Sequence, residues 1–261
     1  MRFTDTLQAA EAVRVIAQSG LNPANCRLLD KAEALNNMVD DGSHAVLVLG
    51  FESADHPQDA KLARALEIAG DHGGAFKTPA RSGAKRDGAA EAWRNAFLRM
   101  PYFREILIPH GVIADTFETA CTWSAFPEFY AGVLDEMSRA IKSITGRDGT
   151  ISCRFTHVYP DGPAPYFSYS CISTPKSMLN HWKEIKLASN ACVIRRGGTA
   201  THHHAVGRDH RVHGYDTECP PLFAEALRGA KAKLDPNGIM NPGVLIDPEG
   251  KRGGSSGVFR G

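Results

Sequence analysis

The chain of 261 residues is long enough for one large domain or two small ones, which excludes a miniprotein held together by disulfides. Its 43% hydrophobic and 23% charged residues are typical of a globular protein and exclude a disordered or fibrous chain. Lys and Arg total 30 and Asp and Glu total 29, so the net charge of +1 supplies no overall positive field to attract nucleic acid or an anionic membrane. Any anion site must therefore be local.

Signals for export and for membrane insertion are missing from the sequence. No run of about 18 apolar residues occurs, and residues 1–20 mix charged with apolar side chains, unlike a signal peptide. The six cysteines are widely separated and form no Cys-x-x-Cys pair, which favours reduced thiols over a disulfide framework or a zinc ribbon. We therefore expect a cytoplasmic protein.

The first third of the chain alternates between helical and extended patterns. Residues 5–18 and 57–72 place apolar side chains at helical spacing, and residues 31–39 indicate a shorter helix. Residues 44–51 (HAVLVLGF) predict a buried strand because they are rich in branched apolar side chains. Residues 26–30 are expected to be extended.

The middle of the chain begins with a segment of small, polar and basic residues, 77–90, which predicts a loop. A helix is expected over residues 89–104, although Pro101 should end or bend it because proline lacks a backbone donor and clashes with the preceding turn. Residues 106–122 are expected to be extended. Residues 127–145 then predict an amphipathic helix that starts at a proline.

Two strands are predicted next, over residues 151–159 and 164–172, because the Pro-Asp-Gly-Pro segment between them is strong turn chemistry. Helices are expected over residues 176–190 and 220–233. This order of elements predicts an α+β fold in which a mainly antiparallel sheet is covered on one face by helices, with further helical elements at the C-terminal end.

The densest chemical signal is the segment GGTATHHHAVGRDHR, residues 197–211. Glycines on both sides let the loop turn tightly, and imidazole is the side chain best suited to exchanging protons near neutral pH. A metal site is the alternative, with His202 and His204 on one face and His210 or His213 as a third ligand. Because no Cys, Asp or Glu stands at ligand spacing beside them, we favour a catalytic or cofactor-facing cluster and expect no metal; a polar structural cluster stays open.

The second signal is the segment KLDPNGIMNPGVL, residues 233–245. Its composition by itself indicates the end of a helix followed by two turns. On composition alone, a structural role is therefore favoured for this segment.

Together these two segments resemble the C-terminal half of FAD-linked oxidases of the vanillyl-alcohol-oxidase/PCMH superfamily, and within it the alkylglycerone-phosphate (alkyl-dihydroxyacetonephosphate) synthases. Further matches to that family are collinear over about residues 1–246. They comprise CRLLD at residues 26–30, the run YFRE…DTFET…W within residues 102–123, and CRFTHVYPDGPAPYF at residues 153–167.

The resemblance implies roles for two arginines. Arg104 would bind the substrate phosphate, which suits a guanidinium because its planar fork matches phosphate oxygens and keeps its charge. Arg27 would support Arg104. Without the resemblance, an ordinary ion pair is the favoured role for either side chain.

The resemblance also implies a proton-handling group. Tyr166 matches the family's catalytic tyrosine, a phenol that passes a proton at the substrate carbon. His202, His203 and His204 match its essential histidines, with His204 as the direct proton acceptor. Without the resemblance, an aromatic residue in the Tyr-Phe pair of a strand is more typical of a core or an interface.

FAD is the cofactor that the resemblance implies, and the segment near the flavin comprises Asn241, Pro242, Gly243, Val244 and Leu245. The family's own form there is Asn-Arg-Asn-Leu-Leu, so individual roles are not transferred. Gly73-Gly74 and Gly197-Gly198 lack a nucleotide-binding fingerprint. We therefore expect the family's N-terminal FAD-binding domain to be absent, FAD to be held mainly by residues outside this chain, and the isolated chain to be inactive.

The domain organisation expected from the resemblance has three parts. Residues 1–195 would form a ferredoxin-like cap or substrate domain. Residues 196–248 would form a C-terminal segment with the His-rich loop and a flavin-facing tail. Residues 249–261 would be a flexible tail, because GGSSGVFRG has the composition of a linker.

Three functions are compatible with these residues and motifs. The first, implied by the resemblance, is exchange of the acyl group of acyl-dihydroxyacetone phosphate for a fatty alcohol in ether lipid biosynthesis. The second is an FAD-linked oxidoreductase of a 2-hydroxy acid or alcohol, and the third is a ligand-binding module that lacks its cofactor domain. The expected partners are a small lipid-phosphate or hydroxy-acid substrate and an FAD-binding domain in cis or in trans, but no nucleic acid. Peripheral membrane association and a homodimer stay open.

Overall fold

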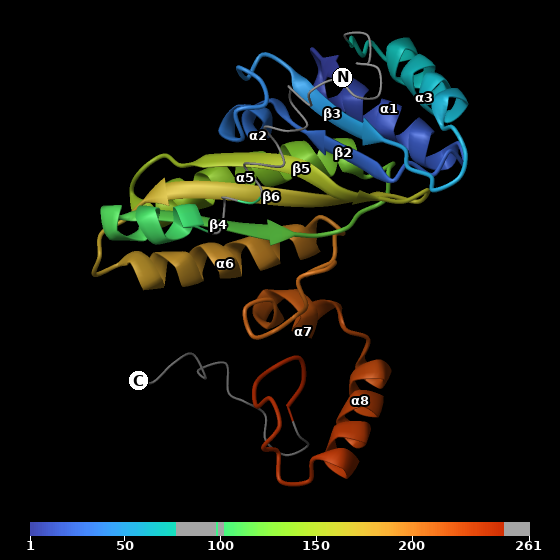
Figure 1. The fold of residues 1–261 in the computed structure, drawn as a ribbon. Coiled ribbons are helices and arrows are strands. Elements are labelled where there is room, and N and C mark those ends of the chain that lie inside the picture. The colour runs from blue at the N-terminus through green and yellow to red at the C-terminus, as the bar shows by residue number, and fades with distance from the viewer. Residues whose placement is uncertain (77–97, 99–101, 248–261) are drawn as a thin grey trace.

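The computed structural model describes residues 1–76, 98 and 102–247. Its centre is a six-stranded, fully antiparallel sheet in the order β1-β3-β2-β5-β6-β4 (Figure 1). The strands are β1 (Arg2–Phe3), β2 (Asn25–Leu29), β3 (Ala45–Gly50), β4 (Val112–Glu118), β5 (Thr150–Val158) and β6 (Pro163–Ile172). With the helices below, this confirms the predicted α+β fold.

Three helices, α1, α5 and α6, cover one face of the sheet, and α3 packs against α1 on the same side (Figure 1). The short helix α2 lies on the opposite face. The helices are α1 (Thr6–Gln18), α2 (Lys31–Asn36), α3 (Asp59–Asp71), α5 (Phe126–Thr145), α6 (Met178–Arg195), α7 (Asp216–Glu218) and α8 (Pro221–Leu234), with a 3-10 turn at Ile108–His110 and a π-type turn at Arg211–Tyr215.

Alternation along the strands separates an apolar face from a polar one. The helix-covered face holds two cores, the first under α1 and α3 and the second under α5 and α6. Their largest buried side chains are Phe3, Ile16, Leu28, Leu47, Phe126 and Phe155 in the first, and Met137, Ile141, Phe167 and Ile185 in the second. On the other face α2 covers a small apolar cluster, so the remaining strand residues there are free to carry polar chemistry.

The helix boundaries follow local capping chemistry. The Asp5 side chain accepts a hydrogen bond from the backbone N–H of Gln8 at 2.8 Å, and α1 begins at the next residue. Helix α5 has Pro127 in its first turn and ends at Thr145, where Gly146 is the C-cap; its φ of 73° is the left-handed conformation that glycine adopts at low cost. These features confirm two of the predicted helices.

Some predicted boundaries are wrong. Residues 106–122 are not extended throughout, because Pro109 lies in the 3-10 turn and Gly111, with a φ of 78°, ends it before β4 begins. The helix predicted over 31–39 ends at Asn36, and the one predicted over 176–190 continues to Arg195. Tertiary packing of α6 on the second core explains the longer helix.

Three predicted segments fall on residues that the structure does not describe. They are the loop over 77–90, most of the helix over 89–104 with Pro101, and the tail 249–261. Residues 102–107 are described and are helical. Among the described parts of the chain, no helix has both the length and the apolar character needed to cross a bilayer.

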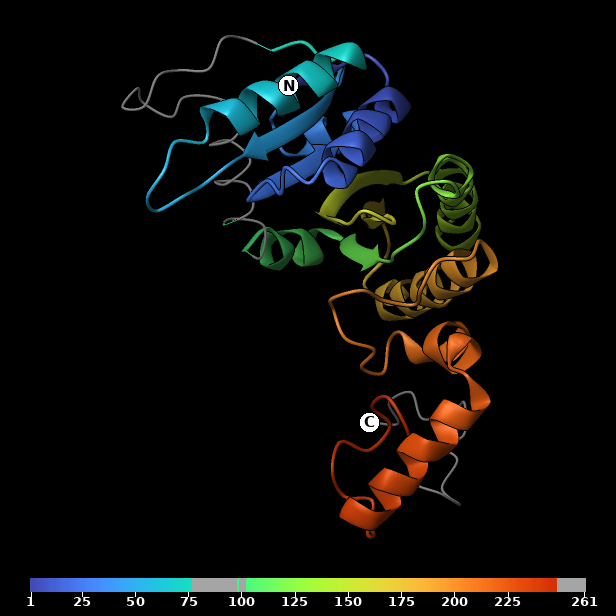
Figure 2. The same cartoon turned by 90° about the vertical axis from the view of Figure 1, so that its right-hand side faces the viewer.

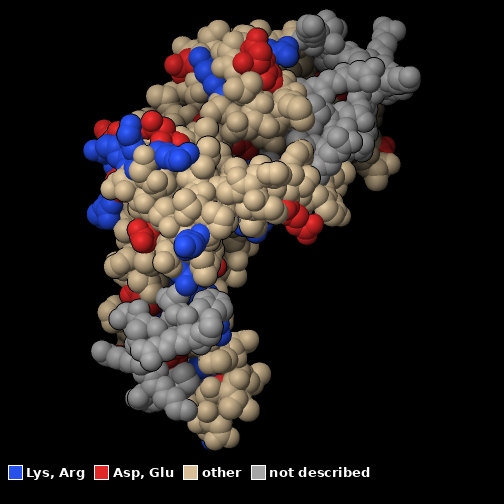
Figure 3. Space-filling view, turned by 90° about the vertical axis from the view of Figure 1, so that its left-hand side faces the viewer, with Lys and Arg blue, Asp and Glu red and all other residues tan. Residues whose placement is uncertain are grey.

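The C-terminal elements α7 and α8 lie beyond α6, at the end of the molecule remote from α1 and α3 (Figure 2). Helix α8 exposes large apolar side chains, with Leu222 78% and Leu234 81% accessible. Acidic and basic side chains both occur on the face shown in Figure 3, in places next to each other.

Candidate functional site

The loop with the three histidines is built around one carboxylate, that of Glu118 at the end of β4. Its Oε1 atom accepts hydrogen bonds from the Thr201 hydroxyl and from the backbone N–H groups of His202, His203 and His204, the last three at 2.6, 2.8 and 2.9 Å. Glu118 is fully buried. Burial raises its pKa, but the hydrogen bonds outweigh burial and bring the pKa down to about 2. The carboxylate therefore stays charged and holds the loop.

Tyr166 lies directly beside this loop. The register of the sheet pairs Tyr166 with Glu118. The Tyr166 ring centroid is 5.9 Å from that of His203 and 5.1 Å from that of His204, and the phenol oxygen is 3.0 Å from Thr116 Oγ1. The structure thus brings the predicted tyrosine together with the predicted histidines.

A buried arginine, Arg154 on β5, packs against the ring of Tyr166. Its Cζ atom lies 3.9 Å from the centroid of the Tyr166 ring, a cation–π arrangement. The guanidinium forms an ion pair with Glu33 of α2 and donates to Ser168 Oγ at 3.2 Å. Arg154 and Glu33 are 8% and 1% accessible, so this pair is fixed inside the fold.

Replacing Arg154 with methionine is expected to lower the free energy of unfolding by about 3 kcal/mol, because Glu33 is left as a buried charge without its partner. Chemical denaturation of both proteins measures the loss. The double variant Arg154→Met/Glu33→Leu removes both charges and should recover most of it. A double variant no more stable than the single one would show that the pair is not the source of the loss.

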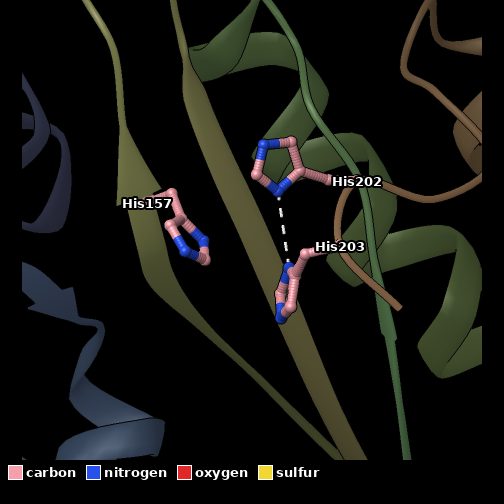
Figure 4. Close-up of side chains that lie close together, drawn as sticks. All are labelled: His157, His202 and His203. Atoms are coloured by element: carbon pink, nitrogen blue, oxygen red, sulfur yellow. Dashed lines mark hydrogen bonds between the residues drawn. The ribbon is translucent and has the colours of Figure 1, made fainter. Parts of the chain in front are cut away.

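His157 of β5 and Tyr159, the residue after the end of β5, complete the cluster; both lie within the matched segment 153–167, but no role was predicted for either. The His157 ring lies 5.2 Å from that of His202 and 4.9 Å from that of His203 (Figure 4). The Tyr159 hydroxyl is 3.0 Å from His202 Nε2. Burial lowers the pKa of His157, and the positive charges of the nearby His203, His202 and Arg27 lower it further. A β-bulge between Phe155 and His157 breaks the alternation that would otherwise reveal which face His157 occupies.

His204 differs from its two neighbours in its surroundings. Burial lowers the pKa of His204. The negative charge of Glu118 raises it, whereas the positive charges of His203, Lys186 and Arg154 lower it further. A lowered pKa keeps the imidazole neutral near pH 7, which is the form that accepts a proton.

Arg104 lies at the edge of the sheet instead of among the histidines. Its Nη2 atom is 3.0 Å from Asp115 Oδ1 on β4, and its side chain is 55% accessible. The other oxygen, Asp115 Oδ2, accepts from the Trp182 indole at 2.6 Å and is 3.1 Å from Lys186 Nζ. Asp115 and Glu118 are three strand positions apart, about 10 Å along β4, so their side chains point to opposite faces of the sheet. No contact within the described residues joins Arg104 to the histidines or to Tyr166.

Arg27 lies on a strand remote from Arg104. It lies on β2, and the sheet order puts β5 and β6 between β2 and β4, a separation of about 14 Å. Among the residues that the structure describes, no contact joins Arg27 to the Arg104–Asp115 pair, and the supporting role of Arg27 stays a prediction. Burial and the charge of Arg154 lower the pKa of Arg27, which places it near the Arg154 and His157 side of the site.

The predicted flavin-facing segment folds back onto the chain just after the histidines. Leu245 N donates to Gly207 O at 3.1 Å, and Arg208 Nη2 donates to the carbonyl of Pro242 at 2.8 Å. The carbonyl oxygen of Gly243 accepts a hydrogen bond from Arg211 Nη1, and the backbone N–H of Val244 donates to the carbonyl oxygen of Asn241. Contact with flavin stays a prediction for this segment, since none of its contacts among the described residues reaches a histidine.

The sheet face opposite α1, α5 and α6 is polar at this end and carries a phenol and imidazoles. The chain belongs to the family of FAD linked oxidases, C-terminal domain, whose family model matches residues 1–245. This membership confirms the predicted resemblance and implies FAD as the cofactor.

Two curated proteins show which members the chain is similar to. Alkyldihydroxyacetonephosphate synthase from Caenorhabditis elegans is 30% identical over 148 residues, which cover 56% of this chain and 25% of that protein. The uncharacterized FAD-linked oxidoreductase YgcU from Escherichia coli K12 is 31% identical over 151 residues, covering 55% of this chain and 30% of that protein. The matched region thus spans less than a third of either relative.

Solved structures show the same fold. An alkyldihydroxyacetonephosphate synthase superposes with a TM-score of 0.67 at 18% identity, covering 92% of this chain and 42% of that one. The 4-ethylphenol oxidase from Gulosibacter chungangensis gives a TM-score of 0.61 at 15% identity, covering 95% of this chain and 53% of that one. At such identities the likeness concerns the fold alone.

Proposed function

We propose that this chain forms the substrate-facing, proton-handling part of an FAD-dependent enzyme similar to alkylglycerone-phosphate synthase. Such an enzyme exchanges the acyl group of acyl-dihydroxyacetone phosphate for a fatty alcohol. The observation that carries the proposal is the contact of Tyr166 with His203 and His204 on the open face of the sheet. The similarity to the C. elegans synthase supports this choice of reaction.

The residues present fit a flavin that approaches from the open sheet face. Tyr166 is paired with Glu118 across the sheet, its ring stacks on that of His203, and the His203 side chain is 33% accessible. When bound, FAD supplies an electron-accepting ring system. Its phosphates would be held by a separate FAD-binding domain, in cis or in trans, because neither glycine pair of this chain opens a nucleotide-binding loop.

Within this proposal the chain's own groups divide the work. Tyr166 is held by Thr116 at its hydroxyl and by Arg154 under its ring, so the phenol has one orientation. His204 packs edge-on against that ring, with an interplanar angle of 85°, and accepts the proton that leaves the substrate carbon. Glu118 keeps the loop at this distance.

Arg104 is the proposed ligand of the substrate phosphate. Asp115 carries one negative charge and is shared by two cations, Arg104 and Lys186, so the group retains a net positive charge. Burial raises the pKa of Asp115, but Lys186 and Trp182 outweigh it and keep the carboxyl ionised. The exposed guanidinium is therefore able to bind an anion while Lys186 still neutralises Asp115.

Replacing Arg104 with alanine is expected to raise KM for the phosphate substrate by about tenfold or more, since hydrogen bonds to charged groups contribute roughly 1.5–3 kcal/mol. Steady-state kinetics of the complete FAD-loaded enzyme measures the change. Arg139, which pairs with Asp135 on the surface of α5, offers a matched control whose replacement should leave KM unchanged. An unaltered KM in the Arg104 variant would remove this arginine from the substrate site.

The reaction itself is tested with the complete FAD-loaded enzyme and an isotopically labelled fatty alcohol. Incorporation of the label into an ether of dihydroxyacetone phosphate, without oxygen consumption, is the expected result. Stoichiometric oxygen consumption or reduction of an added electron acceptor, without ether formation, would contradict it.

A second candidate function is an FAD-linked oxidoreductase of a 2-hydroxy acid or an alcohol. The similarity to YgcU, which is named as an FAD-linked oxidoreductase, favours this candidate. Arg104 would then bind a carboxylate in place of a phosphate, which uses the same guanidinium geometry. The oxygen and acceptor measurements above distinguish the two functions.

A further inference from the structure

We propose that His157, His202, His203 and Glu118 form a binding site for one divalent transition-metal ion of the Zn²⁺ type. One ring nitrogen from each of the three histidines lies within 4.8 Å of the other two. Figure 4 shows the three rings turned toward one another, His157 from β5 and the other two from the loop after α6. The proposal needs neither flavin nor substrate and is therefore independent of the proposed reaction.

The spacing of the donor atoms matches a tetrahedral site. His202 Nδ1 is 3.4 Å from His203 Nδ1, and Glu118 Oε2 is 2.9 Å from His203 Nδ1 and 3.8 Å from His202 Nδ1. In a tetrahedral zinc site with bonds of about 2.0–2.1 Å, neighbouring donor atoms lie about 3.4 Å apart. The observed distances between donor atoms, 2.9, 3.4 and 3.8 Å, lie on either side of about 3.4 Å, so an ion fits between the atoms with small side-chain adjustments.

The Glu118 carboxylate gives an independent reason to expect a cation. Its Oε1 atom accepts four hydrogen bonds, whereas the buried Oε2 accepts no well-aligned hydrogen bond within the described ranges and is contacted only by His203 Nδ1 at 2.9 Å and His202 Nδ1 at 3.8 Å. A buried carboxylate oxygen that faces ring nitrogens in this way is well placed to bind a cation together with them. A metal ion on the side of Oε2 that faces the imidazoles would satisfy it.

The surrounding hydrogen bonds select the ligand atoms. Tyr159 Oη is 3.0 Å from His202 Nε2, which leaves Nδ1 of that ring for the ion. The backbone N–H groups of the loop hold Glu118 Oε1, which leaves Oε2. Such outer partners, which fix the orientation of a ligand, are typical of metal sites in proteins.

The chemistry of the donors sets the class of ion. Three imidazole nitrogens and one carboxylate oxygen favour Zn²⁺, Co²⁺ or Ni²⁺ over Mg²⁺ and Ca²⁺, which prefer oxygen. Tyr166 and His204 stay outside the set of ligands. The ion would join β4 and β5 to the loop and so hold His204 in place beside Tyr166.

The test is titration of the purified, EDTA-treated chain with Co²⁺ and Zn²⁺. Calorimetry should show one Zn²⁺ per chain, and the Co²⁺ complex should have the intense visible bands of a tetrahedral site. Replacing His157 with glutamine, at an exposed strand position, should weaken Zn²⁺ binding by more than about tenfold, because even outer partners of a metal site contribute that much. Circular dichroism verifies that the variant is folded.

His44→Gln is the matched control, because Asp40, Asp41 and His44 form the other grouping of potential ligands in the described chain. This variant should bind Zn²⁺ with unchanged affinity. Glu118→Gln, which retains Oε1 for the loop, should change the visible spectrum of the Co²⁺ complex. No binding by the parent chain, an octahedral Co²⁺ spectrum, or loss of binding in His44→Gln but not in His157→Gln would each overturn the proposal.

Discussion

Replacing Tyr166 with phenylalanine is expected to lower kcat of the complete FAD-loaded enzyme by about 100-fold or more, with little change in KM. The phenylalanine ring keeps its place over Arg154 and beside His203 and His204, so only the hydroxyl and its contact with Thr116 are lost. A positioned proton-transfer group typically contributes roughly 10²–10⁴-fold. Steady-state kinetics with flavin content measured in parallel gives the comparison.

Tyr169→Phe is the matched control for this experiment. Tyr169 lies on the same strand, but its side chain points into the second core on the opposite face. Its replacement should leave kcat unchanged. A Tyr166 variant that retains full kcat, or a Tyr169 variant that loses as much, would remove the tyrosine from the proposed chemistry.

Replacing Glu118 with alanine is expected to reduce kcat by about 100-fold and to destabilise the fold by about 3 kcal/mol. The substitution leaves three backbone N–H groups and the Thr201 hydroxyl without their acceptor. Breaking a buried charged network of this kind lowers the free energy of unfolding by roughly 3–5 kcal/mol. A displacement of a catalytic group by about 1 Å lowers the reaction rate by about 100-fold. Kinetics and thermal denaturation report the two effects separately.

Glu118→Gln separates the support of the loop from the charge of the carboxylate. Its amide oxygen replaces Oε1 as the acceptor for the loop, so the melting temperature should fall much less than in the alanine variant. For a chain of this size, about 3 kcal/mol corresponds to a fall of about 6–12 °C. An alanine variant that melts at the parent temperature would show that the carboxylate does not hold the loop.

Local patterns in the sequence predicted most of the fold. The helical spacing of residues 5–18 and 127–145 and the turn between residues 159 and 164 were sufficient, because caps, prolines and alternation act within a few residues. The wrong boundaries occur where tertiary contacts outweigh local preference. Helix α6, for example, continues to Arg195, whose guanidinium forms an ion pair with Glu136 of α5.

The candidate site was predicted only in part, and the reason is the distance between its residues in the sequence. The resemblance supplied Tyr166 and the three histidines, and the structure brings these together. It matched Glu118 within the run DTFET but gave it no role, because the carboxylate lies 84 positions before His202 and reaches the loop only through the edge of the sheet. His157 was missed because a β-bulge sets its direction.

The sequence by itself determined most of the helices and strands, the family and the types of group that the chemistry uses, since each of these is encoded in neighbouring residues or in short motifs. Only the tertiary structure decided which groups meet. It separated Arg27 from Arg104 by the width of two strands, and it gave the histidines the carboxylate that no neighbouring residue provides. The physical reason is that strand order and register, which are set by burial of the whole sheet, determine which distant side chains share a face.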